Sequence, residues 1–180
     1  MKTKKLVLTA FFAAITAVCS QIVIPLPISP VPLTLSLFAV FLTGTLLEKR
    51  QAFFAQLVYL LLGAFGVPVF AGFQSGFGRL IGPTGGYLVA YPFMAFLAAL
   101  IAEKLKRKPF AANVAGLAAA LLLCYALGTT WLVIFTKMGL YEAFLAGVAP
   151  FIPLDILKIG VAASVSIPLE KAVKKAQTAE

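Results

Sequence analysis

Six long apolar runs separated by short polar joins dominate the sequence. They cover residues 6–24, 33–47, 52–67, 86–102, 111–135 and 154–169. About 20 apolar residues in a helix cross the hydrocarbon core of a bilayer. Only 12% of the residues are charged, whereas a soluble domain has about a quarter. The pattern predicts an all-α integral membrane protein, one membrane domain over residues 1–180 with six transmembrane helices.

The basic residues alternate with these runs. Twelve of the 15 Lys and Arg residues fall in four groups, at 2–5, 49–50, 104–108 and 171–175. Cytoplasmic loops of membrane proteins carry an excess of Lys and Arg. We therefore expect a multi-pass protein with both termini in the cytoplasm and with outer loops at 25–32, 68–85 and 136–153. The same grouping explains the net charge of +9 without any binding of nucleic acid.

The three outer loops are apolar and stiff. The first is rich in proline and cannot be helical, and the third contains an apolar piece at 140–151 that is too short to span and predicts a re-entrant or interfacial helix. Residues 63–88 hold eight of the 14 glycines, which predicts a bent, non-helical segment. Irregular backbone in an apolar setting persists where protein covers it or where it lines a cavity. This segment is therefore either the wall of a small-molecule pocket or a plain hairpin between two helices.

Three charged residues lie away from the cytoplasmic groups. Asp155 and Lys158 are three residues apart at the start of the last run, so they share one face of a helix. A charge in the membrane costs at least ~2.5 kcal/mol and usually marks a functional position. The alternative is a self-neutralising pair that tethers the helix. Arg79, in the second outer loop, either joins this site or reaches headgroups and water.

The sequence lacks the residues that most enzymes need. It contains no His, no nucleophile paired with a base and no cluster of metal ligands. It also lacks the Gly-x-x-x-x-Gly-Lys-Ser/Thr run of a P-loop. We expect a protein that is not an enzyme, with no metal and no cofactor of its own. An importer built on this chain would take ATP energy from another subunit.

Small residues follow one side of the first run. Ala10, Ala13, Ala14 and Ala17 are spaced so that another helix can approach closely in lipid. That helix belongs either to a partner or to the chain's own bundle, and the spacing fits both.

Four motifs resemble one known family, in order along the chain. They are residues 30–34 (Pro-Val-Pro-Leu-Thr), 66–72 (Gly-Val-Pro-Val-Phe-Ala-Gly), 82–88 (Gly-Pro-Thr-Gly-Gly-Tyr-Leu) and 153–158 (Pro-Leu-Asp-Ile-Leu-Lys). Over essentially its whole length the chain resembles BioY, the biotin-binding S component of energy-coupling-factor (ECF) transporters. One departure is Ser36, where many relatives carry Gln.

The resemblance implies a six-helix ECF S-component fold in the cytoplasmic membrane and high-affinity capture of biotin from outside. It implies partners as well, a transmembrane T component and two ATPase subunits. The pairs Ala10/Ala14 and Ala13/Ala17 match the family's Ala-x-x-x-Ala docking spacing. The substrate-binding residues it implies are Thr34, Arg79, Gly85, Gly86, Tyr87, Asp155 and Lys158.

Roles follow from the chemistry of biotin, which has an apolar chain, a ureido ring and a carboxylate. Asp155 accepts from a ureido N–H or holds Lys158 in place. Lys158 or Arg79 meets the carboxylate. Gly85 and Gly86 let the backbone approach the ring.

Other functions fit parts of the sequence. An S component for riboflavin or thiamine is one. A stand-alone proton-coupled carrier with Asp155 as its proton site is another, although the six runs show no inverted repeat. An intramembrane enzyme is disfavoured by the missing catalytic residues.

Overall fold

The computed structural model describes residues 2–25, 31–105 and 109–178. The predictions that involve Pro30 and the basic residues Lys106, Arg107 and Lys108 lie outside these ranges. In chain order the elements are α1 (Lys2–Ser20), β1 (Val23–Ile24), β2 (Leu33–Thr34), α2 (Ser36–Leu46), α3 (Lys49–Ala64), α4 (Phe77–Ile81), α5 (Gly85–Lys104), α6 (Pro109–Thr136), α7 (Leu140–Gly147) and α8 (Ile152–Thr178).

Each of the six apolar runs lies largely within one helix, namely α1, α2, α3, α5, α6 or α8. Within the described part of the chain, four helices are long and apolar enough to cross a membrane: Thr3–Ser20, Gly85–Lys104, Pro109–Thr136 and Ile152–Val173. The other two are shorter, with 11 residues in α2 and 16 in α3. The protein is therefore mostly helical and built around four helices of membrane-spanning length.

Two boundaries differ from the sequence prediction. Helix α1 ends at Ser20 rather than near residue 24, because the chain turns into a small antiparallel hairpin in which Val23 pairs with Thr34 and Ile24 with Leu33. The segment 63–88 is not wholly non-helical. It contains α4, and α5 begins at Gly85, with Thr84 at the N-cap position.

The turns of segment 63–88 lie at glycines, as the sequence predicted. Gly66, Gly72 and Gly76 all have positive φ angles, of 99°, 69° and 94°, which glycine adopts without steric cost. Phe73 also has a positive φ, of 58°, in the middle of the turn. Helix α7 occupies the short apolar piece that predicted a helix in the third outer loop.

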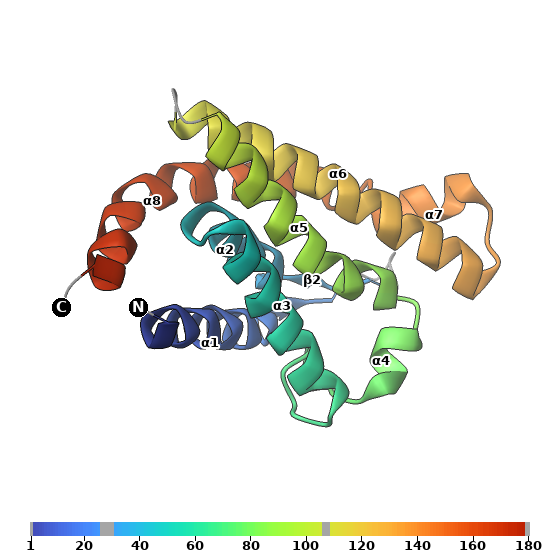
Figure 1. The fold of residues 1–180 in the computed structure, drawn as a ribbon. Helices are drawn as coiled ribbons and strands as arrows, with labels where there is room; N and C mark the ends of the chain where they lie inside the picture. The colour runs from blue at the N-terminus through green and yellow to red at the C-terminus, as the bar shows by residue number, and fades with distance from the viewer. Residues whose placement is uncertain (1, 26–30, 106–108, 179–180) are drawn as a thin grey trace.

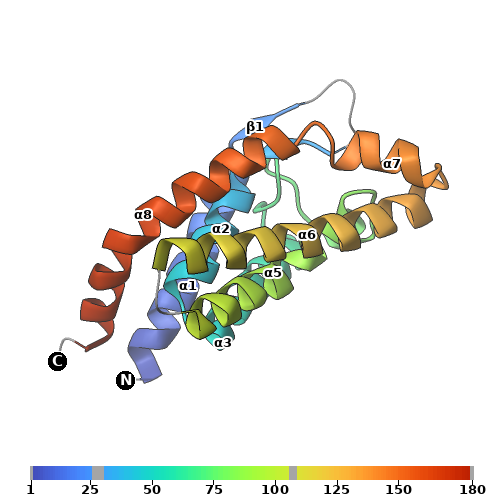
Figure 2. The same cartoon turned by 90° about the horizontal axis from the view of Figure 1, so that it is seen from above.

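Helix α5 is the centre of the bundle. It packs along α6, and the two run side by side in both views (Figures 1 and 2); its other sides meet α3 and α2. Ala98 lies at a close contact of three helices, because a Cβ added to Gly44 of α2 or to Gly116 of α6 would collide with it. Small residues thus bring three helices into close contact. Helix α8 covers α2 and α6, curves along its length (Figure 2) and contains Pro168.

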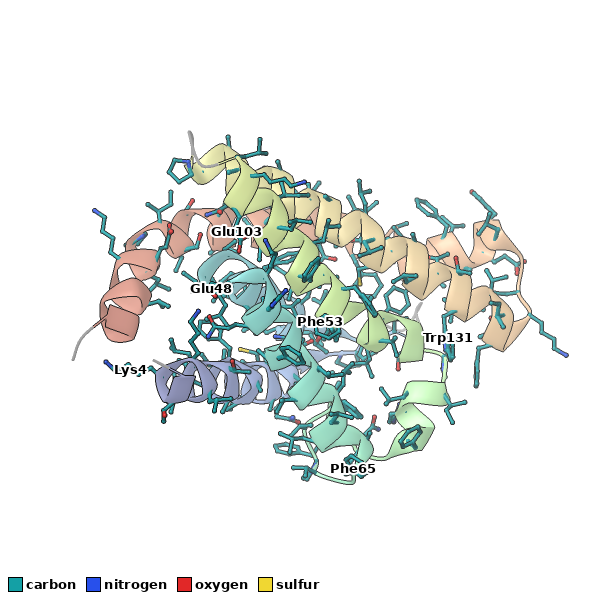
Figure 3. All side chains as sticks on the ribbon, viewed as in Figure 1. Lys4, Glu48, Phe53, Phe65, Glu103 and Trp131 are labelled. Carbon is teal, nitrogen blue, oxygen red and sulfur yellow. The ribbon has the colours of Figure 1, made fainter. Side chains whose placement is uncertain are left out.

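The two ends of the bundle differ in chemistry. The chain termini lie at the same end (Figure 1), and Lys4, Glu48 and Glu103 lie toward that end, whereas Phe65 and Trp131 lie toward the other (Figure 3). Ion pairs tie the helices at the first end, Lys5 to Glu48 at 2.7 Å and Lys49 to Glu103 at 2.8 Å. The opposite end, which carries α4 and α7, is called the α4–α7 end below.

Candidate functional site

Two small cavities adjoin one another toward the α4–α7 end. The first, of about 60 Å³, is called the α8 cavity and is lined by Asp155, Lys158 and Tyr125 among others. The second, of about 70 Å³, is called the Arg79 cavity and is lined by Arg79 and Gln74 among others. They share the lining residues Val31, Pro32, Thr34, Tyr87 and Tyr91. The two cavities therefore form one site with two differently charged ends.

The charges of the α8 cavity are paired with one another. The Lys158 ammonium donates to Asp155 Oδ1 at 2.9 Å and to the carbonyl oxygen of Thr34 at 3.1 Å. The Tyr125 hydroxyl donates to the other carboxylate oxygen, Asp155 Oδ2, at 2.8 Å. Asp155 is buried, with 2% of its surface exposed, and a buried charge is stable only when it is paired and hydrogen-bonded in this way.

The Arg79 cavity is different. Arg79 lies on α4 and is half-buried. Its guanidinium has no hydrogen-bond or ion-pair partner among the described residues, and it faces a cavity lined by the Gln74 amide and the aromatic residues Tyr59 and Phe70. This end of the site therefore presents a positive charge that a bound anion can satisfy.

A chain of hydroxyl groups runs between the two ends. Thr34 Oγ1 and Ser36 Oγ lie 2.6 Å apart, and Ser36 Oγ lies 2.8 Å from the Tyr91 hydroxyl. Each hydroxyl can donate or accept, so the chain can offer either function to a ligand. The Tyr91 ring also stacks on Tyr59, with centroids 6.3 Å apart.

The glycine-rich segment contributes part of the wall of the Arg79 cavity, which is one of the two alternatives that the sequence left open. Phe70, Ala71 and Gln74 line the Arg79 cavity. The end of α1 holds this wall in place. Ser20 Oγ donates to the carbonyl oxygen of Val69, while Gln21 bonds the carbonyl of Phe70 at 3.3 Å and accepts from the backbone N–H of Phe73 at 2.7 Å.

The structure brings five of the seven predicted binding residues to the site: Thr34, Arg79, Tyr87, Asp155 and Lys158. Gly85 and Gly86 are not among the described lining residues of either cavity. A Cβ on Gly85 would collide with the carbonyl oxygen of Leu80, and one on Gly86 with the Trp131 side chain. Their lack of a side chain thus serves the packing of α4, α5 and α6. Trp131 completes this contact by donating to the carbonyl of Gly82 at 2.9 Å.

Several lining residues were absent from the predicted set. Tyr91 and Tyr125 are of a residue type that fits a ligand site and equally a belt at the membrane interface. Spacing offered one signal, because Tyr91 follows Tyr87 by four residues on α5 and so shares its face. No local signal linked Ser36 to Tyr91 or Tyr125 to Asp155, since each pair joins different helices.

The four alanines of α1 divide into two faces. Ala10 and Ala14 are exposed, whereas Ala13 is 2% exposed and belongs to the core. Ala17 is half-buried and packs against that core. Within this chain, Ala13 is therefore an internal packing residue rather than part of an outward face.

In the described part of the chain, four helices of membrane-spanning length surround this site, which has one cationic end and one neutralised polar end, so the fold is that of a membrane protein with a small internal site. Residues 1–175 match the BioY family, and the chain belongs to that family. It is 41% identical to the probable biotin transporter BioY of Pyrococcus horikoshii, over 94% of this chain and 98% of that protein. It is 40% identical to the biotin transporter BioY of Thermotoga maritima, over 93% of this chain and 96% of that one.

The fold also matches a solved structure. The crystal structure at 2.1 Å of the S-component for biotin from an ECF-type ABC transporter superposes with a TM-score of 0.88 at 26% sequence identity, covering 94% of this chain and 92% of that one. The resemblance seen in the sequence motifs is confirmed. Because the family consists of transporter components, the expectation that the chain is not an enzyme is confirmed as well.

Proposed function

We propose that the chain captures biotin from outside with high affinity and passes it across the cytoplasmic membrane as the substrate-specific subunit of an ATP-driven ECF transporter. The observation that carries this proposal is the pair of adjoining cavities, one with Arg79, which has no partner among the described residues, and the other with a neutralised polar cluster. A ligand with one carboxylate and one polar ring matches both ends. The relatives' names point to biotin.

The charge pattern suggests an orientation for the ligand. Arg79 meets the carboxylate, because Lys158 is already neutralised by Asp155 at 2.9 Å. The ureido ring occupies the α8 cavity. There the Lys158 ammonium, which has three hydrogens and uses two of them, donates the third to the ureido oxygen. Asp155 holds Lys158 in place. The formal charges of Arg79, Asp155 and Lys158 sum to +1, which one carboxylate cancels.

The site must widen to admit such a ligand. Small-molecule pockets measure about 300–1,000 Å³, and the two cavities measure about 60 and 70 Å³. Val31 and Pro32 line both, so we propose that an outward shift of this part of the first loop joins the cavities and opens them to the outside.

The membrane topology and the partners belong to the same proposal. Helices α2 and α3 complete a set of six spans, and both termini face the cytoplasm together with the ion-paired end. A T component docks on the outward face of α1, where Ala10 and Ala14 leave room for a close helix and Leu6, Val7 and Val18 are exposed. Two ATPase subunits supply the energy, and this chain needs no metal or cofactor of its own.

A ligand panel tests the substrate. Purified protein is titrated with biotin, riboflavin and thiamine, and we expect binding of biotin alone. Uptake of labelled biotin by cells with and without ATP depletion then tests the energy source. Tight binding of another vitamin would overturn the substrate, and uptake that survives ATP depletion would favour a stand-alone carrier.

Paired substitutions on α1 test the docking face. Ala14→Trp should leave biotin binding intact and reduce uptake, because it blocks an outward surface. Ala13→Trp should lower stability and binding together, because Ala13 is buried and an overfilled core is strained. Uptake unchanged by Ala14→Trp in cells that depend on the ECF module would contradict docking at this face.

A further inference from the structure

Tyr125 stands out among the residues that line the site. It lies on α6 and contacts the ligand-binding pair of α8 through one bond, from its hydroxyl to Asp155 Oδ2 at 2.8 Å. Asp155 in turn holds Lys158, and Lys158 reaches across to the carbonyl of Thr34 on β2. One series of bonds thus runs from α6 through α8 to the first outer loop.

The two oxygens of Asp155 have separate partners. Oδ1 accepts from Lys158 and Oδ2 from Tyr125. The carboxylate is buried, so an oxygen without a donor would be costly. If the Tyr125 hydroxyl were absent, Oδ2 would lose its donor, while Lys158 already bonds the other oxygen of the same carboxylate at 2.9 Å. The carboxylate would then compete for the ammonium hydrogens that Lys158 uses elsewhere.

Those hydrogens are limited in number. The ammonium has three, of which one goes to Asp155 and one to Thr34. A second bond to Asp155 would consume the third or pull the ammonium away from Thr34. The first change would leave the α8 cavity without a free ammonium hydrogen. The second would move the ammonium group away from its position beside Thr34.

We propose that Tyr125 is a positioning residue for ligand recognition, whose hydroxyl occupies Oδ2 of Asp155 and so keeps one Lys158 hydrogen available to the polar ring of the ligand. This inference rests on the proposed function, in which that ring is the ureido group of biotin. Tyr125 acts through Asp155 and Lys158 and needs no polar contact of its own with the ligand.

The substitution Tyr125→Phe tests it, because it removes the hydroxyl and keeps the ring. Affinity of the full-length purified protein for biotin should fall by about tenfold, the effect of one hydrogen bond to a charged group. Biotin methyl ester should lose the same factor, since the affected contact is at the ring. Tyr141→Phe is the matched control. That tyrosine is 74% exposed on α7, and its substitution should leave affinity unchanged.

A second background separates positioning from packing. In the Asp155→Asn/Lys158→Met double variant no buried charge is left unpaired, and there Tyr125→Phe should change affinity by less than about twofold. An equal loss in both backgrounds would overturn the inference and make Tyr125 a packing or direct ligand contact. Unchanged affinity in Tyr125→Phe would overturn it too. Wild-type protein that fails to bind biotin would instead overturn the proposed function, and this inference with it.

Discussion

The α8 cavity and the Arg79 cavity share lining residues but differ in whether their charged groups are paired. In the first, Asp155 and Lys158 neutralise each other and Tyr125 and Thr34 complete their hydrogen bonds. In the second, Arg79 faces the cavity with no partner among the described residues. The Asp155–Lys158 cluster makes its hydrogen bonds within the protein, so it needs no ligand to complete them. A lone cation gains its partner when an anion binds.

The largest effect is expected from breaking the neutral cluster. Lys158→Ala leaves Asp155 buried and unpaired, which should lower the free energy of unfolding by about 3–5 kcal/mol. Thermal melting without ligand checks this. The Asp155→Asn/Lys158→Met double variant should recover most of the loss. Biotin and its methyl ester should weaken together. A loss confined to the acid would show that Lys158, rather than Arg79, meets the carboxylate.

An intermediate effect, on affinity alone, is expected from removing the charge of the Arg79 cavity. Arg79→Ala removes the charged partner of the carboxylate, and a hydrogen bond to a charged group contributes about 1.5–3 kcal/mol. Affinity for biotin should fall by roughly ten- to a hundredfold, as measured by titration calorimetry. The ester should lose little and melting without ligand should stay unchanged, because Arg79 has no described partner to leave behind. Equal losses for acid and ester would contradict the proposed orientation.

The smallest loss of affinity is expected from interrupting the hydroxyl chain between the two cavities. Ser36→Ala interrupts the hydroxyl chain from Thr34 to Tyr91. Neutral hydrogen bonds contribute about 0.5–1.5 kcal/mol each, so affinity for acid and ester alike should fall by about two- to tenfold. Titration of both ligands measures it. A change in the ratio of acid to ester affinity would show that the chain acts on one end of the ligand instead of joining both.

The sequence predicted the neutral cluster better than the lone cation. Asp155 and Lys158 are three residues apart in a regular helix, so their pairing follows from helix geometry. The position of Arg79 depends on α4 and on the turns at Gly66, Gly72 and Gly76, because these turns bring α4 to the cavity. Its lack of a partner is a property of the folded chain that local spacing does not encode.

Long-range contacts also explain why Gly85 and Gly86 line neither cavity. Gly85 and Gly86 belong to a motif shared with relatives, which suggested backbone contact with a ligand. The space beside them is filled by Leu80 and Trp131, and Trp131 lies on another helix. For the same reason the contact of Tyr125 with Asp155 was not predicted, whereas the helical runs, governed by local hydrophobicity, were.

The close contact of α2, α5 and α6 at Ala98 bears on how mutational scans of this chain should be read. Gly44 and Gly116 flank this alanine, and none of the three has a polar side chain. A scan scored by uptake would rank them beside Arg79, since a larger residue at any of them would force the helices apart. Sensitivity to substitution would then mark two unrelated demands, room for a backbone and contact with a solute. Thermal melting of the same variants without ligand would separate them, because it registers weakened packing and not the loss of a contact that forms only when the solute binds.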